Sequence, residues 1–208
     1  MFSPRVYFRQ IETYNLALWP LQILTLLVGI GLLCLLVRAL PNTSRIVAVV
    51  LAALWLFVGW TYLWSHLSSI NWAATYAAYG FVAQAILLLV VQVIPRRTGV
   101  SLPGRLSGGV IMAGAVLVYP GLSVIAGRGL GTSEVFGIMP DPTAIATIGF
   151  LTATRHRYDF LLFIIPTLWC AVSSITLFTL GDPIWWVPLT MCLIGISLAI
   201  AKRSGTRP

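Results

Sequence analysis

The chain has few charged residues. Of its 208 residues, 9% are Asp, Glu, Lys or Arg, only 5 are acidic, and 59% are hydrophobic. Water-soluble domains carry about 25% charged residues, so the composition excludes an ordinary soluble domain. Together with a mean hydropathy of +0.94, it predicts an all-α, polytopic transmembrane helix bundle.

Residue types that bind metals or catalyse reactions are also scarce. The chain has 2 histidines and 3 cysteines, and it lacks Cys-x-x-Cys, His-Glu-x-x-His, Gly-x-Ser-x-Gly and Walker motifs. These absences argue against a zinc site, a serine hydrolase and a nucleotide loop. The single lysine, Lys202, follows the last apolar stretch, which leaves no buried lysine for a retinal Schiff base. We therefore expect no cofactor and no metal, and an enzyme is less expected than a non-catalytic protein.

Seven apolar stretches follow one another, separated by short polar breaks. A helix crosses a ~30 Å hydrocarbon layer in about 20 residues, and most of the stretches reach that length. The fifth has only 13 residues, so it is either a half-span or is joined in the membrane by the segment before it. The expected spans are Ala17 to Val37, Arg45 to Ser65, Trp72 to Ile94, Leu106 to Ala126, Pro142 to Thr154, Phe160 to Leu180 and Pro183 to Ala201.

The basic residues collect at every second break and so predict the topology, because Lys and Arg in short loops stay on the cytoplasmic side. Seven crossings, with the N-terminus outside and the C-terminus cytoplasmic, put ten basic residues inside and three outside. Six crossings, with a re-entrant fifth stretch, give at best eight against five, so seven are favoured. The ten are Arg38, Arg45, Arg96, Arg97, Arg105, Arg155, Arg157, Lys202, Arg203 and Arg207, and the three are Arg5, Arg9 and Arg128.

We expect one transmembrane domain over residues 1–208, with the helix bundle at 17–201 and a basic cytoplasmic tail at 202–208. Ser3 and Pro4 suit a helix cap and its first turn. Residues 1–16 are therefore either a helix in the lipid headgroup region or an ordinary juxtamembrane tail. The net charge of +8 is spread over the loops, so the expected partner is the lipid bilayer and not nucleic acid.

The predicted topology collects acidic residues on the outer side. They are Glu12, Glu134, Asp141 and Asp182, and His66 and six of the eight tryptophans fall there too. One interpretation is simple segregation, since acids avoid a positive inner face and tryptophan favours membrane interfaces. The other is a polar site that opens outward, in which His66, Glu134 and Asp141 bind a ligand or carry protons. The tryptophans expected above this site are Trp60, Trp64 and Trp72.

Residues 135–143, Val-Phe-Gly-Ile-Met-Pro-Asp-Pro-Thr, carry the most specific local signal. Two prolines around Asp141 cannot continue a helix, but Asp141 suits the cap of a new helix and Pro142 its first turn. We therefore expect a helix to begin at Asp141 below the outer surface, reached by the non-helical Val135 to Met139. A tight surface loop over a short tilted helix is nearly as well supported. The preceding Gly127 to Ser133 lacks the lysine of a phosphate loop and is interpreted as a flexible connector.

Neutral polar residues near or within the spans are further candidates. Tyr76 and Gln84 are expected to share a face of the third span, with Asn71 just before it. These three could line a pathway for a solute or ion, or could only make hydrogen bonds between helices. Cys170 and Cys192 lie at similar depth in consecutive spans and are interpreted as packing residues that can touch.

Several short motifs along the chain carry a resemblance. They are Tyr14-Asn15, Trp19-Pro20, Gln22, Ile70-Asn71, Ala74, Gln84, Tyr119-Pro120 and residues 136–143. Together they resemble a bacterial family of small polytopic membrane proteins with no assigned function, over nearly the whole chain. The most specific motif is the Gly-x-x-Pro-x-Pro-Thr stretch from Gly137 to Thr143. The resemblance implies the bacterial inner membrane and a cysteine between the two prolines in many relatives, where this chain has Asp141. It implies no reaction.

Two functions remain open from the sequence. The broken segment at Pro140 to Pro142 and the outward polar residues favour a channel or transporter for a small solute or ion. The lack of charged residues in the middle of the spans and the small size of the bundle favour a non-catalytic partner or assembly subunit. Such a subunit would bind another membrane protein or further copies of itself.

Overall fold

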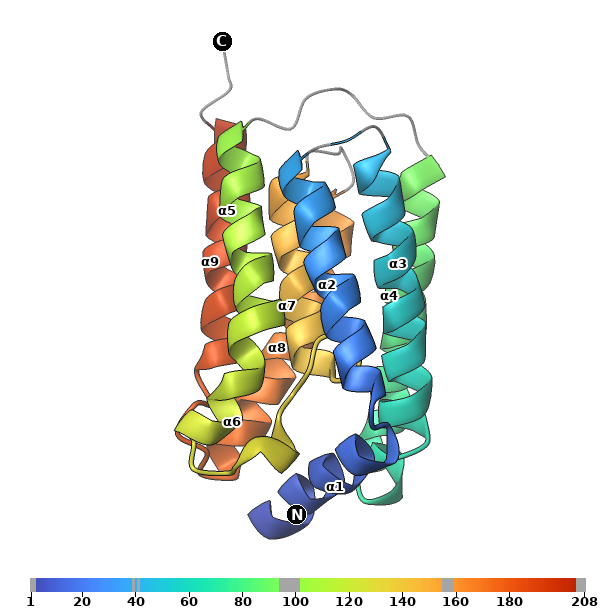
Figure 1. Cartoon of the computed structure of the whole chain (residues 1–208), viewed down its shortest axis with the longest axis vertical. Helices are drawn as coiled ribbons and strands as arrows, with labels where there is room; N and C mark the ends of the chain where they lie inside the picture. The colour runs from blue at the N-terminus through green and yellow to red at the C-terminus, as the bar shows by residue number, and fades with distance from the viewer. Residues whose placement is uncertain (1–2, 39, 41, 94–101, 155–158, 205–208) are drawn as a thin grey trace.

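A computed structural model describes residues 3–38, 40, 42–93, 102–154 and 159–204. All regular structure in these residues is helical, which confirms the all-α prediction. Of the eight helices of 12 or more residues in the described part of the chain, seven run along the long axis of the molecule, each antiparallel to the one before it, and one crosses one end (Figure 1). The seven are α2 (Leu21–Arg38), α3 (Thr43–Val58), α4 (Ala73–Val93), α5 (Leu102–Ala113), α7 (Pro140–Ala153), α8 (Asp159–Thr179) and α9 (Val187–Ser204).

The crossing helix is α1 (Pro4–Ala17), and we call the end that it covers the α1 end (Figure 1). Ser3 caps α1 by accepting a hydrogen bond from the Val6 backbone N–H at 3.4 Å, and proline occupies the first turn, as predicted. Ile11 and Tyr14 are buried against the bundle, whereas most of the opposite face is polar and exposed. The helix therefore lies on the end of the bundle and not alongside it.

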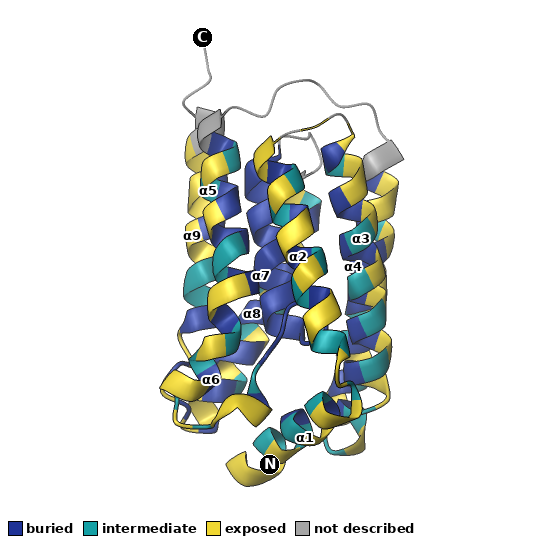
Figure 2. Cartoon of the chain, in the orientation of Figure 1, coloured by how far each residue is buried: buried dark blue, intermediate teal, exposed yellow. Residues whose placement is uncertain are grey.

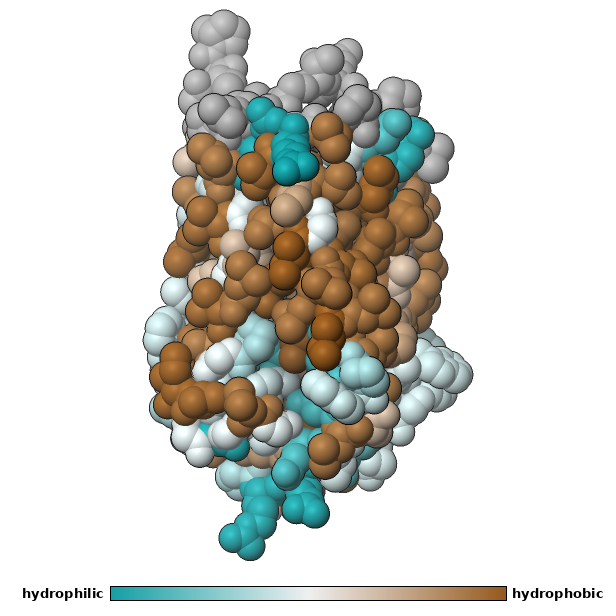
Figure 3. Space-filling view, in the orientation of Figure 1, coloured by the Kyte–Doolittle hydropathy of each residue, from teal (hydrophilic) through white to brown (hydrophobic). Residues whose placement is uncertain are grey.

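Five helical segments are long and apolar enough to cross a membrane. Many of their large hydrophobic side chains are exposed, and Figure 3 shows them as a broad apolar band between two more polar ends. An exposed apolar surface of this extent is typical of a protein that contacts lipid. The five are Leu21–Arg38, Thr43–Ser69, Ala73–Val91, Gly104–Ile125 and Phe160–Thr179, and Val187–Ala201 is a shorter apolar helix.

Helix α7 is the centre of the bundle. All of its residues are buried, and it packs against α5, α8, α9 and α3 (Figure 2). Its closest neighbour is α5, because Gly149 and Gly108 let the two backbones touch: a Cβ at Gly149 would lie 2.7 Å from the Gly108 carbonyl oxygen. A helix that is enclosed by protein does not face lipid, so this 14-residue helix does not need the length of a full membrane span.

The segment before α7 enters the bundle without helical structure. Val135 to Met139 are all buried, and the chain rises through them from the α1 end to the start of α7 (Figure 1). This is the arrangement expected when protein covers non-helical backbone at membrane depth, and it differs from a tight surface loop. The segment before α7 is thus buried inside the bundle together with the helix.

Two of the long helices change their winding near the α1 end. Helix α3 continues as a π-helix, Gly59–Trp64, and a 3₁₀ turn, Leu67–Ser69. Helix α5 continues as a π-helix, Gly114–Val118, then a 3₁₀ turn, Tyr119–Gly121, and ends in α6 (Leu122–Ile125). Such changes of winding re-aim side chains and often accompany functional sites.

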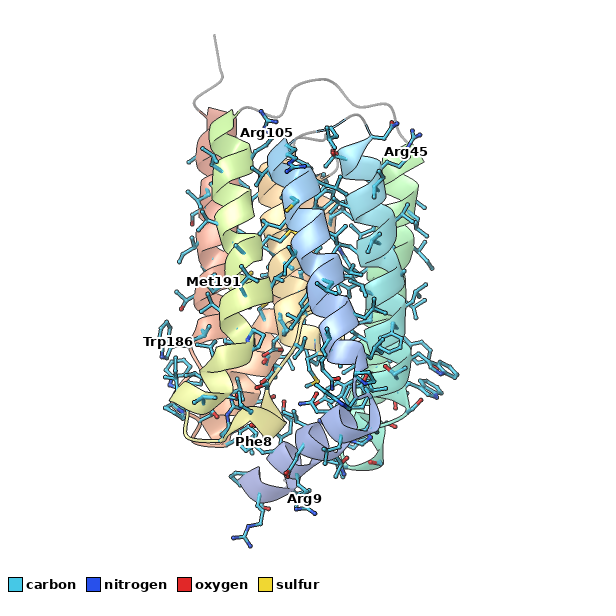
Figure 4. The ribbon with its side chains drawn as sticks, viewed as in Figure 1. Phe8, Arg9, Arg45, Arg105, Trp186 and Met191 are labelled. Carbon is cyan, nitrogen blue, oxygen red and sulfur yellow. The ribbon has the colours of Figure 1, made fainter. Side chains whose placement is uncertain are left out.

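The charged residues divide between the two ends. Arg45 and Arg105 lie at the end opposite α1, whereas Arg9 lies at the α1 end (Figure 4). The predictions that involve Arg96, Arg97, Arg155, Arg157 and Arg207 lie outside the described residues, as do the side chains of Lys202 and Arg203.

Candidate functional site

A buried group of charges lies under α1, and we call it the Arg128 cluster. The Arg128 guanidinium lies 3.3 Å from an Asp182 carboxylate oxygen and 3.8 Å from one of Glu134. It also lies 4.5 Å from the centre of the Phe8 ring on α1. The exposed fractions of the three charged side chains are 9%, 2% and 6% respectively. Charged side chains are rarely buried to this degree without a partner of opposite charge.

Two glycines flank Arg128 and form the turn that carries it. Gly127 and Gly129 have φ of +74° and +82°, a left-handed conformation that other residues adopt only with strain. Between them, the Arg128 backbone N–H donates to the Ser123 carbonyl at 2.8 Å. The interpretation of Gly127 to Ser133 as a flexible connector is therefore wrong, because the segment is a turn that is held by an ion pair.

The cluster has more negative than positive charge. Burial, together with the nearby Asp141 carboxylate, raises the pKa of Glu134 to about 8, although Arg128 opposes the rise. Asp182 also raises it, because its negative charge repels a second negative charge nearby. Glu134 can therefore gain or lose a proton near neutral pH.

Asp141 is held by three donors from two other helical segments. The Tyr119 hydroxyl and the Trp169 indole N–H donate to its carboxylate at 2.9 Å and 2.6 Å, and the Ser173 hydroxyl donates to the same oxygen as Tyr119. Tyr119 belongs to the 3₁₀ turn after α5, and the other two residues lie one turn apart on α8. Three donors, with the N-terminus of α7 beside them, stabilise negative charge on this carboxylate.

The prediction that Asp141 caps α7 is wrong. Met139 is the N-cap, Pro140 is the first helical residue, and Asp141 lies in the first turn. Thr143 completes this end of the helix, because its hydroxyl donates to the Met139 carbonyl at 2.7 Å and accepts from the Gly137 N–H at 2.9 Å. The Asp141 carboxylate is thus free of the cap and is directed to Tyr119, Trp169 and Ser173.

The structure places the other members of the predicted outward pocket as follows. Glu134 and Asp141 lie close enough to interact electrostatically. The ring of His66 instead faces α1, 2.9 Å from the Gln10 carbonyl and 3.5 Å from the Thr13 hydroxyl. The tryptophan at the Asp141 carboxylate is Trp169. The three tryptophans that were expected above the pocket are exposed: Trp60, Trp64 and Trp72.

The neutral candidates Asn71, Tyr76 and Gln84 lie in different surroundings. Gln84 is fully buried, and its amide donates to the Leu162 carbonyl at 3.1 Å, whereas Tyr76 is 67% exposed and packs edge-on against Trp72. The prediction that Tyr76 and Gln84 share a face is therefore wrong, because residues eight apart on a helix lie about 80° apart around its axis. Asn71 lies on the wall of a small cavity between α4 and α8, which Trp169 and Ser173 also line.

Tyr7 connects α1 with both carboxylates. Its side chain reaches Tyr62, and burial followed by the charges of Glu134 and Asp141 raises the pKa of the Tyr7 hydroxyl. Cys170 and Cys192, which the sequence predicted to touch, interact through their thiols. Within the part of the chain that the structure describes, no three His, Cys, Asp or Glu side chains converge as metal ligands.

The fold and the site define a class: an all-helical protein, with helices suited to crossing a membrane and buried charged residues at one end. The chain belongs to the family of unknown function DUF6064, whose family model matches residues 4–207. The predicted membership of a family without an assigned function is thereby confirmed. No curated protein and no solved structure matches the chain.

Proposed function

We propose that the protein crosses the bacterial inner membrane seven times, with the α1 end outside, and transports a small cation or protons through Glu134 and Asp141. The observation that carries the proposal is the excess of buried carboxylates: Glu134 and Asp182 share the guanidinium of Arg128, and Asp141 is buried close enough to Glu134 to interact with it. If all four groups are ionised, the net charge of this region is −2. An uncompensated charge away from water is costly, so such a region takes up protons or a cation.

The two carboxylates suit different tasks. Asp141 has three hydrogen-bond donors that stabilise its negative charge, so it can hold a cation. Glu134 has a pKa of about 8, so it can release a proton when a cation approaches and take one up when the cation leaves. Buried carboxylates inside a helix bundle are typical of proton relays in pumps and transporters.

The site is closely packed on both sides. This packing favours a transporter in a closed state and argues against an open channel. On the outer side, α1 covers the cluster, because the Asn15 amide donates to the Gly131 and Ser133 carbonyls at 2.9 Å and 2.8 Å. Towards the other end, α5 and α7 are in backbone contact at Gly108 and Gly149. In this proposal, α1 moves to open the site, and its contacts with Arg128 are those that must break.

The experiment is an ion-flux assay in liposomes that contain the purified protein, driven by a pH gradient or a cation gradient. Asp141→Asn is the informative variant: the new amide can donate to the Tyr119 and Ser173 hydroxyls, and its oxygen can accept from Trp169, so the fold is retained without the charge. We expect Asp141→Asn and Glu134→Gln to reduce flux at least tenfold, since each removes a charge from the buried site.

The matched control is Glu12→Gln, which removes one negative charge at the same end of the molecule from a side chain that is 43% exposed. It should transport as the native protein does. Native flux in Asp141→Asn, or no flux above empty liposomes for the native protein with any small cation, would contradict the proposal.

A non-catalytic partner subunit is the second candidate, and one observation favours it. A groove of about 360 Å³ lies on the outside of the bundle between α3 and α4, lined by Trp60, Trp64, Tyr79 and Gly59 among others. Apolar grooves between helices accept the side chains of another helix. A membrane protein that co-purifies with the native chain but not with Gly59→Leu, in the absence of ion flux, would establish this function instead.

A further inference from the structure

A small cavity lies beside the Asp141 carboxylate. It occupies about 60 Å³ between the start of α4 and the middle of α8, under Tyr7 of α1. Trp169 and Ser173 line it, and both donate a hydrogen bond to Asp141, so the cavity is one side chain away from the buried charge.

The polar groups that line the cavity mostly present acceptors to it. The Ser173 hydroxyl hydrogen is donated to Asp141, and that of Thr176 to the Val172 carbonyl at 2.8 Å. The lone pairs of both hydroxyl oxygens remain. The Asn71 side-chain oxygen caps α4 by accepting from the Ala73 N–H at 3.1 Å, and it has a second lone pair. These three oxygens favour a cation over an anion, and the rest of the lining is aliphatic or aromatic.

The aromatic walls act in the same direction. Tyr7 and Trp169 both line the cavity, and the faces of aromatic rings attract cations. Because the Trp169 N–H is hydrogen-bonded to a carboxylate, its ring lies next to the negative charge of Asp141. The ligand must be small, since one water molecule already requires about 10 to 15 Å³ of such space.

From this lining and size we propose that the cavity between Asn71, Trp169 and Thr176 is a binding site for a small monovalent cation of the ammonium or alkali-metal class. Asp141 supplies the compensating charge through Ser173 and Trp169. The role of the bound ion in transport rests on the function proposed above, but the binding itself does not.

The test uses the purified full-length protein in detergent, with no gradient. Thermal unfolding is followed while ammonium, sodium, potassium or tetrabutylammonium chloride is titrated at constant ionic strength. At least one of the three small cations should raise the melting temperature saturably, and tetrabutylammonium should not, because its four butyl chains are too bulky for a cavity of this size. The small cation that acts identifies the ligand.

Two variants locate the effect. Thr176→Val removes one oxygen from the wall without leaving a buried donor, and we expect about tenfold weaker half-saturation, as for the loss of one hydrogen bond to a charge. Ala77→Leu fills the cavity from α4 and should abolish the response. Thr179→Val is the matched control, because its hydroxyl bonds only within α8 at an exposed position outside the cavity.

Equal responses to all four salts, or native half-saturation in both Thr176→Val and Ala77→Leu, would overturn the site. A cation response that follows these variants, without ion flux in liposomes, would instead establish the site and refute transport. The failure of one proposal is thus distinguishable from the failure of the other.

Discussion

Replacing Glu134 by glutamine should remove most of the pH dependence of the protein's stability between about pH 5 and pH 9. Burial and the neighbouring carboxylates raise the pKa of Glu134 from 4.5 to about 8 in the folded protein. A carboxyl whose folded pKa is raised stabilises the fold while it is protonated, and this stability is lost as the pH rises through the folded pKa. The native protein should therefore become less stable as the pH rises from about 5 to 9.

The expected loss of stability follows from the size of the pKa change of Glu134. Each pKa unit corresponds to about 1.36 kcal/mol, so full ionisation of Glu134 costs about 5 kcal/mol. For a chain of this length, that loss lowers the melting temperature by about 10 °C or more. Glu134→Gln is neutral at every pH, so it should melt near the native temperature at pH 5 and well above it at pH 9.

The assay is thermal unfolding in detergent at constant salt, over steps of half a pH unit. Glu12→Gln serves as the control, since the exposed Glu12 should leave the native pH profile in place. A native melting temperature that is constant from pH 5 to 9, or a Glu134→Gln profile parallel to the native one, would refute the reasoning about the Arg128 cluster.

Three further variants test the packing and the buried charges. Arg128→Met leaves two buried carboxylates without a counter-charge and should lower the free energy of unfolding by about 3 to 5 kcal/mol. Loss of the exposed Arg9 should lower it by under about 1 kcal/mol, and denaturant titration measures both. Gly149→Ala places a Cβ 2.7 Å from backbone atoms of α5 and should lower the melting temperature, while Gly31→Ala, with nothing within 4 Å, should leave it unchanged or raise it slightly. Asp141→Ala leaves three donors without their acceptor and should be less stable than Asp141→Asn by about 1 to 3 kcal/mol, and equal melting temperatures would contradict that geometry.

The sequence predicted those features that depend on neighbouring residues. Ser3 and Pro4 define the start of α1 through their own backbone geometry. The prolines at 140 and 142 exclude a continuing helix, so a break in this place followed from covalent structure alone. Hydrophobic length identified the helices that could span a membrane, since each apolar stretch is continuous in the sequence.

The features that were missed depend on residues far apart in the chain. Asp before proline has a strong local tendency to cap a helix, but the Asp141 carboxylate is bonded by side chains 22, 28 and 32 positions away, which outcompete the cap. One signal was available: Trp169 and Ser173 are four residues apart, so both donors lie on one face of a helix. The ion pairs of Arg128 were not predicted, because its partners Glu134 and Asp182 lie in two different loops.

The most direct test of the account is whether the site by Asp141 is reached from the outer side of the membrane. Thr176→Cys, in a chain without its native cysteines, places a thiol on the cavity wall, and a small charged thiol reagent is applied to intact cells. Ser69→Cys is an exposed control at the α1 end, and Leu40→Cys one at the opposite end. The account predicts that Ser69→Cys and Thr176→Cys react from outside, with the bound cation slowing the reaction of Thr176→Cys alone, and that Leu40→Cys reacts only after the membrane is permeabilised. Reaction of Leu40→Cys from outside, or of Thr176→Cys only from the cytoplasmic side, would contradict it.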